Sequence, residues 1–204
     1  MKTTLLILAS LLLLGTGTLS AQLDPLAGKR YGIKSAIIKK EARGMGNSSM
    51  ANTLYFDDYG EREATEMTLK MGEAEKHIRV IAEDGGRTNV TLDLDEKKAA
   101  RTPTPDQPRN FRNLSQADID RFKIRETGEE TIAGRPCKKY DMELTITGVT
   151  VQIRLWIWEG IALKTETSHN GRVMLTDEAV EVEENVLVPD DKFDLPADTE
   201  VAGN

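Results

Sequence analysis

The chain has 204 residues, a formal net charge of −7, 39% hydrophobic residues and a single cysteine, Cys137. An acidic balance argues against a phosphate backbone as partner, so we expect no nucleic-acid binding. One cysteine excludes a disulfide scaffold; we expect Cys137 to be a small buried apolar residue, the alternative being a reactive thiol.

Residues 1–21 have the features of a secretory signal peptide. Lys2 supplies a positive charge, residues 5–14 are almost wholly apolar, and small residues ending at Ala21 precede the expected cleavage point. The apolar run is about half of the roughly 20 residues that a membrane-spanning helix needs. No cysteine stands where a lipoprotein would require one. We therefore expect a periplasmic mature chain, residues 22–204, that is one domain without a transmembrane segment or lipid anchor.

Strand patterns dominate the first half of this chain. Apolar residues alternate with polar ones in short segments separated by turn residues, as in antiparallel strands. On one of these segments Met50, Leu54 and Phe56 share a face. The segment 61–71 is the most polar, so we expect it to be an edge or solvent-facing strand. The predicted strands are 33–42, 49–56, 61–71, 77–82, 88–94 and 99–102.

A proline-rich connection and one helix follow. Residues 102–108 contain three prolines, which exclude a central strand or a helix interior. Ser115 has the features of an N-cap, and Asp118 in the first turn suits the helix dipole. Ile119 and Phe122 then lie on one apolar face. We predict a surface connection followed by a single helix.

Strands resume beyond Gly128 and become longer. Asn170-Gly171 is the strongest hairpin signal, because both central residues of a type I′ turn take positive φ. Met142 and Leu144 share the apolar face of the longest strand. About ten antiparallel strands in meander order, with one helix inserted, exclude a doubly wound α/β fold and predict a mainly β (α+β) bent sheet or barrel. The predicted strands are 129–132, 137–147, 149–158, 161–168 and 172–184.

The strand 149–158 poses a question about its two faces. Its apolar residues point one way, and the opposite set ends in Trp156 and Trp158, the only tryptophans of the chain. Two neighbouring large aromatics are rarely left exposed. We expect the segment around Phe193 or the helix carrying Phe122 to cover them. Whether they would then be structural core or ligand contacts is left open.

The sequence contains no recognisable catalytic or metal-binding motif. His77 and His169 lack partners at metal-ligand spacing. The segment 93–95 resembles the start of a calcium loop, but Lys97 and Lys98 stand where that loop needs an oxygen ligand and a glycine. A nucleophile elbow, a phosphate-binding glycine loop and a dinucleotide fingerprint are also missing from the sequence. We therefore expect a protein that is not an enzyme and that uses neither metal nor cofactor.

Four short segments are distinctive in combination. The strand entry 131–140, the tryptophan strand that runs through a glycine turn into Gly-Ile-Ala-Leu-Lys (155–164), and the ending 188–197 occur in the second half. These three resemble the LolA and LolB superfamily of periplasmic lipoprotein carriers and sorting factors. The segment 52–60 is similar to one in the uncharacterised secreted relatives of these carriers. The resemblance implies an unclosed antiparallel half-barrel whose concave side is covered by helical segments and, in the carriers, holds acyl chains.

By this resemblance the protein is a non-enzymatic binding protein of a bacterial envelope that holds a lipid, an acyl chain or another hydrophobic ligand. An alternative is an interaction module with a filled core that presents strand 61–71 or segment 103–108 to another envelope protein. A continuous apolar cavity of roughly 300 Å³ or more would favour the first, and a filled core the second. The expected ligand contacts are Met50, Leu54, Phe56, Phe122, Met142, Leu144, Trp156 and Trp158.

Overall fold

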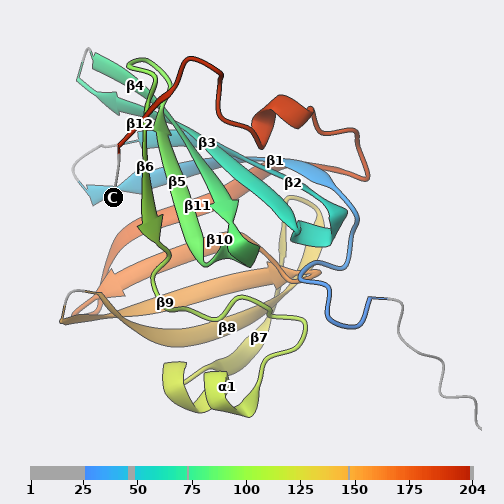
Figure 1. The fold of residues 1–204 in the computed structure, drawn as a ribbon. Coiled ribbons are helices and arrows are strands. Elements are labelled where there is room, and N and C mark those ends of the chain that lie inside the picture. The colour runs from blue at the N-terminus through green and yellow to red at the C-terminus, as the bar shows by residue number, and fades with distance from the viewer. Residues whose placement is uncertain (1–25, 46–48, 73, 147, 203–204) are drawn as a thin grey trace, which may run out of the picture.

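A computed structural model describes residues 26–45, 49–72, 74–146 and 148–202. The expected signal peptide, residues 1–21, lies outside the described residues. Within them, twelve strands form one strongly bent, unclosed sheet with one α-helix against it, which confirms the predicted mainly β half-barrel (Figure 1). The strands are β1 Ala36–Gly44, β2 Ser49–Asp57, β3 Arg62–Met71, β4 Ala74–Glu83, β5 Thr88–Asp93, β6 Lys98–Pro103, β7 Arg125–Ile132, β8 Arg135–Ile146, β9 Val149–Trp158, β10 Ile161–His169, β11 Arg172–Glu184 and β12 Glu200–Val201. The helices are α1 Gln116–Phe122 and the short 3-10 turns η2 Asp58–Gly60, η3 Asp84–Gly86 and η4 Asp190–Lys192.

Two antiparallel meanders make up the sheet. Strands β1 to β6 form one and β7 to β11 the other, and the first strand of one pairs with the last strand of the other. In this β1–β11 ladder Ala36 lies opposite Glu184, and the Lys39 ammonium lies 2.8 Å from the Glu181 carboxylate. The order ends with β12 on one side and β7 on the other, so the half-barrel is not closed by hydrogen bonds. The meander was predicted, but the long-range joint between its halves was not.

Strand β3 is not an edge strand, so the edge alternative of the prediction for segment 61–71 is wrong. It is hydrogen-bonded to β2 on one side and to β4 on the other. Its polarity has a different cause, because its carboxylates are used in ion pairs on both faces of the sheet. Glu63 pairs with Arg30, and Glu66 pairs with Arg79.

Three apolar clusters hold the fold. The first gathers Tyr31 and Phe56 with residues of β1, β9 and β10. The second lies between α1 and the apolar face of β8 and β9, where Phe122 is buried. The third lies on the other face of β3 to β6, where Phe193 and Leu195 of the C-terminal segment pack against the sheet. Figure 1 shows this segment in red along the outside of the sheet.

The tryptophans are covered, but not by the predicted elements. Trp156 and Trp158 pack with Ile132 and Cys137 in the first cluster, whereas Phe122 and Phe193 belong to the other two. Charged side chains complete the cover. The ammonium groups of Lys139 and Lys164 lie 5.8 and 4.8 Å from the Trp156 ring centroid, and Arg135 lies 5.3 Å from that of Trp158. These contacts let β9 end in aromatics on its polar face.

The predicted helix cap and the predicted hairpin turn are both confirmed. The Ser115 hydroxyl accepts a hydrogen bond from the Asp118 N–H at 3.0 Å, as an N-cap should. Asn170 and Gly171 have φ of 49° and 75°, the left-handed values that a type I′ turn requires.

Cys137 is buried, and burial raises the pKa of its thiol, which favours the structural interpretation over a reactive one. No helix in the described ranges is long and apolar enough to cross a membrane.

Candidate ligand-binding cavity

A cavity of about 450 Å³ lies on the concave face of the sheet. This volume is within the range of small-molecule sites, and it exceeds the roughly 300 Å³ that separates the two functional hypotheses. Both meanders contribute to its wall, together with the connection that leads to α1. The apolar part of the lining comprises Ala42, Met50, Leu54, Met67, Phe111, Met142, Ile153, Leu155, Ile157, Ile161, Ala162 and Leu175.

The N-terminal segment 29–34 packs against strand ends beside the cavity. The Tyr31 ring lies 4.6 Å from that of Phe56, and its hydroxyl donates a hydrogen bond to Glu63. Burial and the charge of Glu63 raise the pKa of Tyr31 well above its ordinary value, so the hydroxyl stays protonated. Gly60 makes room for this ring, since a Cβ there would lie 2.6 Å from a Tyr31 ring carbon.

The connection between β6 and α1 covers the cavity. Gln107, Pro108, Arg109 and Phe111 line it, and Pro108 is buried. The Phe111 ring packs on Tyr140 at 5.7 Å between centroids. The segment predicted as a surface connection is therefore also part of a lid, and α1 continues this cover over β8 and β9.

A polar group interrupts the apolar wall. Lys40 on β1, Asn52 on β2 and Asp177 on β11 all line the cavity. The Lys40 Nζ donates to Asp177 Oδ2 at 2.9 Å, and the Asn52 Nδ2 donates to Asp177 Oδ1 at 2.7 Å. The side chains of Lys40 and Asp177 are only 10% and 20% exposed. We call Lys40, Asn52 and Asp177 the polar triad.

The structure places three of the predicted ligand contacts on the cavity wall, namely Met50, Leu54 and Met142. The others lie in the apolar clusters and are not part of this lining. Phe56 packs under Tyr31, Leu144 and Phe122 lie in the cluster under α1, and Trp156 and Trp158 lie in the cluster with Cys137.

Sequence reasoning missed the polar triad, although a signal for it existed. Lys40 follows Ile38 and precedes Ala42 at period two, and Asn52 stands between Met50 and Leu54 in the same way. A polar residue on an otherwise inward-facing apolar row marks a buried polar site. Asp177 shows the same pattern on β11, where it stands between Leu175 and Ala179 at period two.

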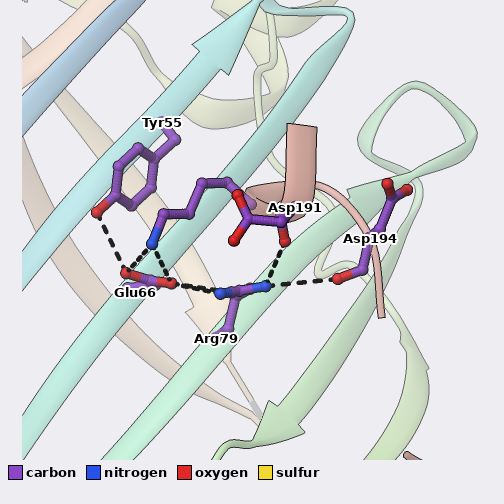
Figure 2. A network of polar contacts seen from close by, with 6 residues as sticks. Tyr55, Glu66, Arg79, Asp191 and Asp194 are labelled. Carbon is purple, nitrogen blue, oxygen red and sulfur yellow. Dashed lines mark hydrogen bonds and ion pairs between the residues drawn. The ribbon is translucent and has the colours of Figure 1, made fainter. Parts of the chain in front are cut away.

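A second polar cluster lies on the outer face of the sheet (Figure 2). Glu66 accepts hydrogen bonds from Arg79 at 3.0 and 2.7 Å, from Lys192 at 3.0 and 3.1 Å, and from the Tyr55 hydroxyl at 3.2 Å. Arg79 also donates to the carbonyl oxygens of Asp191 and Asp194.

Burial would raise the pKa of Glu66, but the hydrogen bonds and charges of Lys192 and Arg79 outweigh it and hold that pKa below its ordinary value. None of Tyr55, Glu66 and Arg79 lines the cavity. This cluster fastens the C-terminal segment to the sheet. Within the described residues, no group of three or more His, Cys, Asp or Glu side chains is placed to hold a metal ion.

The sequence from residue 41 to 167, more than half of the chain, matches a family model described as Domain of unknown function (DUF4412). No curated protein matches the sequence.

Solved structures share the fold at low identity. An uncharacterised conserved protein from Thermus thermophilus is 13% identical with a TM-score of 0.55, over 83% of this chain and 90% of that one. A chain of the Pseudomonas aeruginosa MucA/MucB complex is 14% identical with a TM-score of 0.52, over 82% of this chain and 58% of that one. The present chain thus spans little more than half the length of that protein.

A domain described as an outer membrane lipoprotein-sorting protein domain, from Vibrio parahaemolyticus, is 10% identical with a TM-score of 0.40, over 82% of this chain and 92% of that one. The Thermus thermophilus protein and the chain of the MucA/MucB complex show that the fold is shared.

Proposed function

The chain belongs to the DUF4412 family, and we propose that it is a periplasmic, non-enzymatic binding protein that holds a hydrophobic ligand in its half-barrel. The single observation that carries this proposal is the cavity of about 450 Å³ on the concave face, lined mainly by apolar side chains. Transfer of apolar ligand surface from water into such a site gains roughly 25 cal/mol per Å². The ligand class is a lipid, an acyl chain or a molecule of similar apolarity.

Three features support an exchangeable ligand site over a filled core. The cavity remains open after the lid has packed, and it is lined by both meanders. Its wall includes Met50, Met67 and Met142, whose flexible side chains adapt to ligands of different shape. The lid residues belong to a connection outside regular secondary structure, which can move at less cost than a strand.

Mass spectrometry of an organic extract tests this proposal. The protein is purified from an envelope fraction without detergent, extracted, and compared with an unrelated envelope protein purified in parallel. We expect an enriched apolar molecule in the extract, or saturable uptake of a fluorescent fatty acid by the extracted and refolded protein. A folded protein that carries no such molecule and takes up no fatty acid would contradict the proposal.

Binding to an envelope protein partner is the second candidate function. It is supported by one of the solved structures with a similar fold, which is a complex of MucA and MucB. The two surfaces that the sequence suggested for such contacts are already used within this chain. Strand β3 is paired on both sides, and Gln107 and Pro108 line the cavity. Deletion of residues 102–110 distinguishes the candidates: loss of a partner with unchanged ligand content would favour the interaction module.

A further inference from the structure

We propose that the polar triad of Lys40, Asn52 and Asp177 selects amphipathic ligands with an anionic head group, such as a long-chain carboxylate or alkyl phosphate. The inference rests on the proposed function, since it specifies which hydrophobic ligand the same cavity takes. The head group would lie against the Lys40 ammonium, and the tail would lie along the apolar wall formed by residues such as Leu155 and Ile157.

The hydrogen bonds of the triad leave donors free. An ammonium group has three N–H donors, and among the described residues Asp177 is the only acceptor bonded to that of Lys40. The Asn52 amide has two N–H donors, and one of them is used on Asp177. N–H donors of Lys40 and Asn52 therefore remain for a ligand at this point of the cavity wall.

The charge of the wall also favours an anion. The whole chain has a net charge of −7. The charged side chains that line the cavity are Arg30, Lys40, Arg109 and Asp177. Arg30 is paired with Glu63 and Lys40 with Asp177, so Arg109 leaves the wall with an excess of positive charge. A concave site with low-dielectric walls concentrates ligands of charge opposite to its own.

A purely structural role for the Lys40–Asp177 pair is the weaker explanation. Moving an ion pair out of water costs more than its attraction returns unless further hydrogen bonds satisfy the group, and apolar residues at such positions are often equally or more stabilising. The pair sits in a wall where its neighbours are Ala42, Met50 and Leu54. A ligand that satisfies the free donors explains why charged residues stand there.

Competition binding measures head-group selection directly. Fluorescent cis-parinaric acid is bound to the purified protein and displaced by palmitate, hexadecyl phosphate, hexadecanol or acetate. We expect both anionic amphiphiles to compete about tenfold or more better than hexadecanol, as a charged hydrogen bond is worth at least that factor. Acetate, which has the anion without the tail, should not compete.

The test variant is Lys40→Met combined with Asp177→Leu, because Lys40→Met alone leaves a buried carboxylate without its partner. This variant should bind hexadecanol as before and lose the preference for the anions. Lys39→Met is the matched control, since Lys39 is the next residue, half-exposed and paired with Glu181 on the other face. Circular dichroism and thermal unfolding check that each variant folds.

Each outcome separates the two proposals. Equal binding of palmitate and hexadecanol by the wild type overturns head-group selection but agrees with the proposed binding of a hydrophobic ligand in the cavity. Retained selection in the double variant, or its loss in Arg109→Met instead, overturns the role of the triad. Absence of any binding by a folded wild type overturns both.

Discussion

At the scale of single residues, the contact between the N-terminal segment and the β9–β10 turn depends on a glycine. Gly160 has φ of +85°, and a Cβ at this position would lie 2.5 Å from the carbonyl oxygen of Arg30. The neighbouring Glu159 carbonyl accepts a hydrogen bond from the Gly32 N–H at 2.8 Å. This turn therefore has to approach the segment that carries Tyr31, which gives a physical reason for the glycine at a turn that the sequence predicted.

Gly160→Ala should lower the free energy of unfolding by more than the conformational cost alone, which is about 1–2 kcal/mol for a left-handed alanine. The added methyl group also displaces the Arg30 carbonyl, which costs roughly 1–3 kcal/mol more. Gly171→Ala is the matched control, because its φ is +75° but no atom lies within 4 Å of the new methyl group. Urea denaturation of the two variants measures the difference, and equal losses would show that the close approach is absent.

Trp156 and Trp158 should matter for stability and not for ligand binding. Both are buried, and the Trp156 Nε1 donates to Glu130 at 2.8 Å, yet neither lines the cavity. Replacement of either by alanine should cost about 3–5 kcal/mol of stability. Fatty-acid uptake at a temperature where the variants remain folded should be unchanged. Stability equal to that of the wild type would mean that the cover on this end of β9 is missing.

At the scale of elements, the C-terminal strap, residues 188–201, contacts the sheet in two places. Phe193 and Leu195 cover the apolar outer face of β3 to β6. Beyond them, the N–H groups of Glu200 and Ala202 donate to the carbonyl oxygens of Lys97 and Ala99, which places β12 along the edge of β6. The strap thus protects an edge that would otherwise be open to pairing with another chain.

Glu66→Gln should loosen this strap in a pH-dependent way. The pKa of Glu66 is depressed in the folded state, so its contribution is present above the unfolded pKa of about 4.5 and is lost as the pH falls through the folded pKa. At pH 7 the variant should lose about 1.5–3 kcal/mol. This gap to the wild type should narrow below about pH 4.5.

Denaturation at pH 7 and at pH 3 measures both quantities. Glu181→Gln serves as the control, because the Glu181–Lys39 pair is about half exposed and such pairs are worth less than about 1 kcal/mol. A gap for Glu66→Gln that is the same at both pH values would contradict the assigned role of its charge.

Some features of the helix, turns and strands could be predicted from the sequence, and others could not. The cap at Ser115 and the turn at Asn170 were predictable because their signals are local: one side chain and one backbone conformation decide each. Strand β3 was misplaced at an edge because polarity was taken as exposure, whereas Glu63 and Glu66 meet cations from distant segments. Arg30 and Lys192 are such partners, and no periodicity in β3 reveals them.

At the scale of the whole molecule, the pairing of β1 with β11 creates the cavity. This ladder brings Asp177 next to Lys40, 137 positions away in the sequence. Within each meander, the turns between strands can be predicted from short stretches of sequence. The pairing of the two meanders joins residues far apart in the chain, and no short stretch of sequence predicts it. The class of fold was therefore predictable, as were three wall residues, Met50, Leu54 and Met142. The hydrogen bonds that join the polar triad, and the lid over the cavity, could be seen only in the assembled sheet.

Filling the cavity tests the central claim most directly. Ala162 lies on the cavity wall, and Ala51 is exposed on β2 at a position that alternates with the inward-facing Met50 and Asn52. Fluorescent fatty-acid titrations of the wild type, Ala162→Phe and Ala51→Phe are compared after thermal unfolding has shown that all three fold. A ligand held in the half-barrel requires saturable binding that is lost or weakened at least about tenfold, or 1.4 kcal/mol, in Ala162→Phe and retained in Ala51→Phe. Unchanged binding by a folded Ala162→Phe protein would contradict the account.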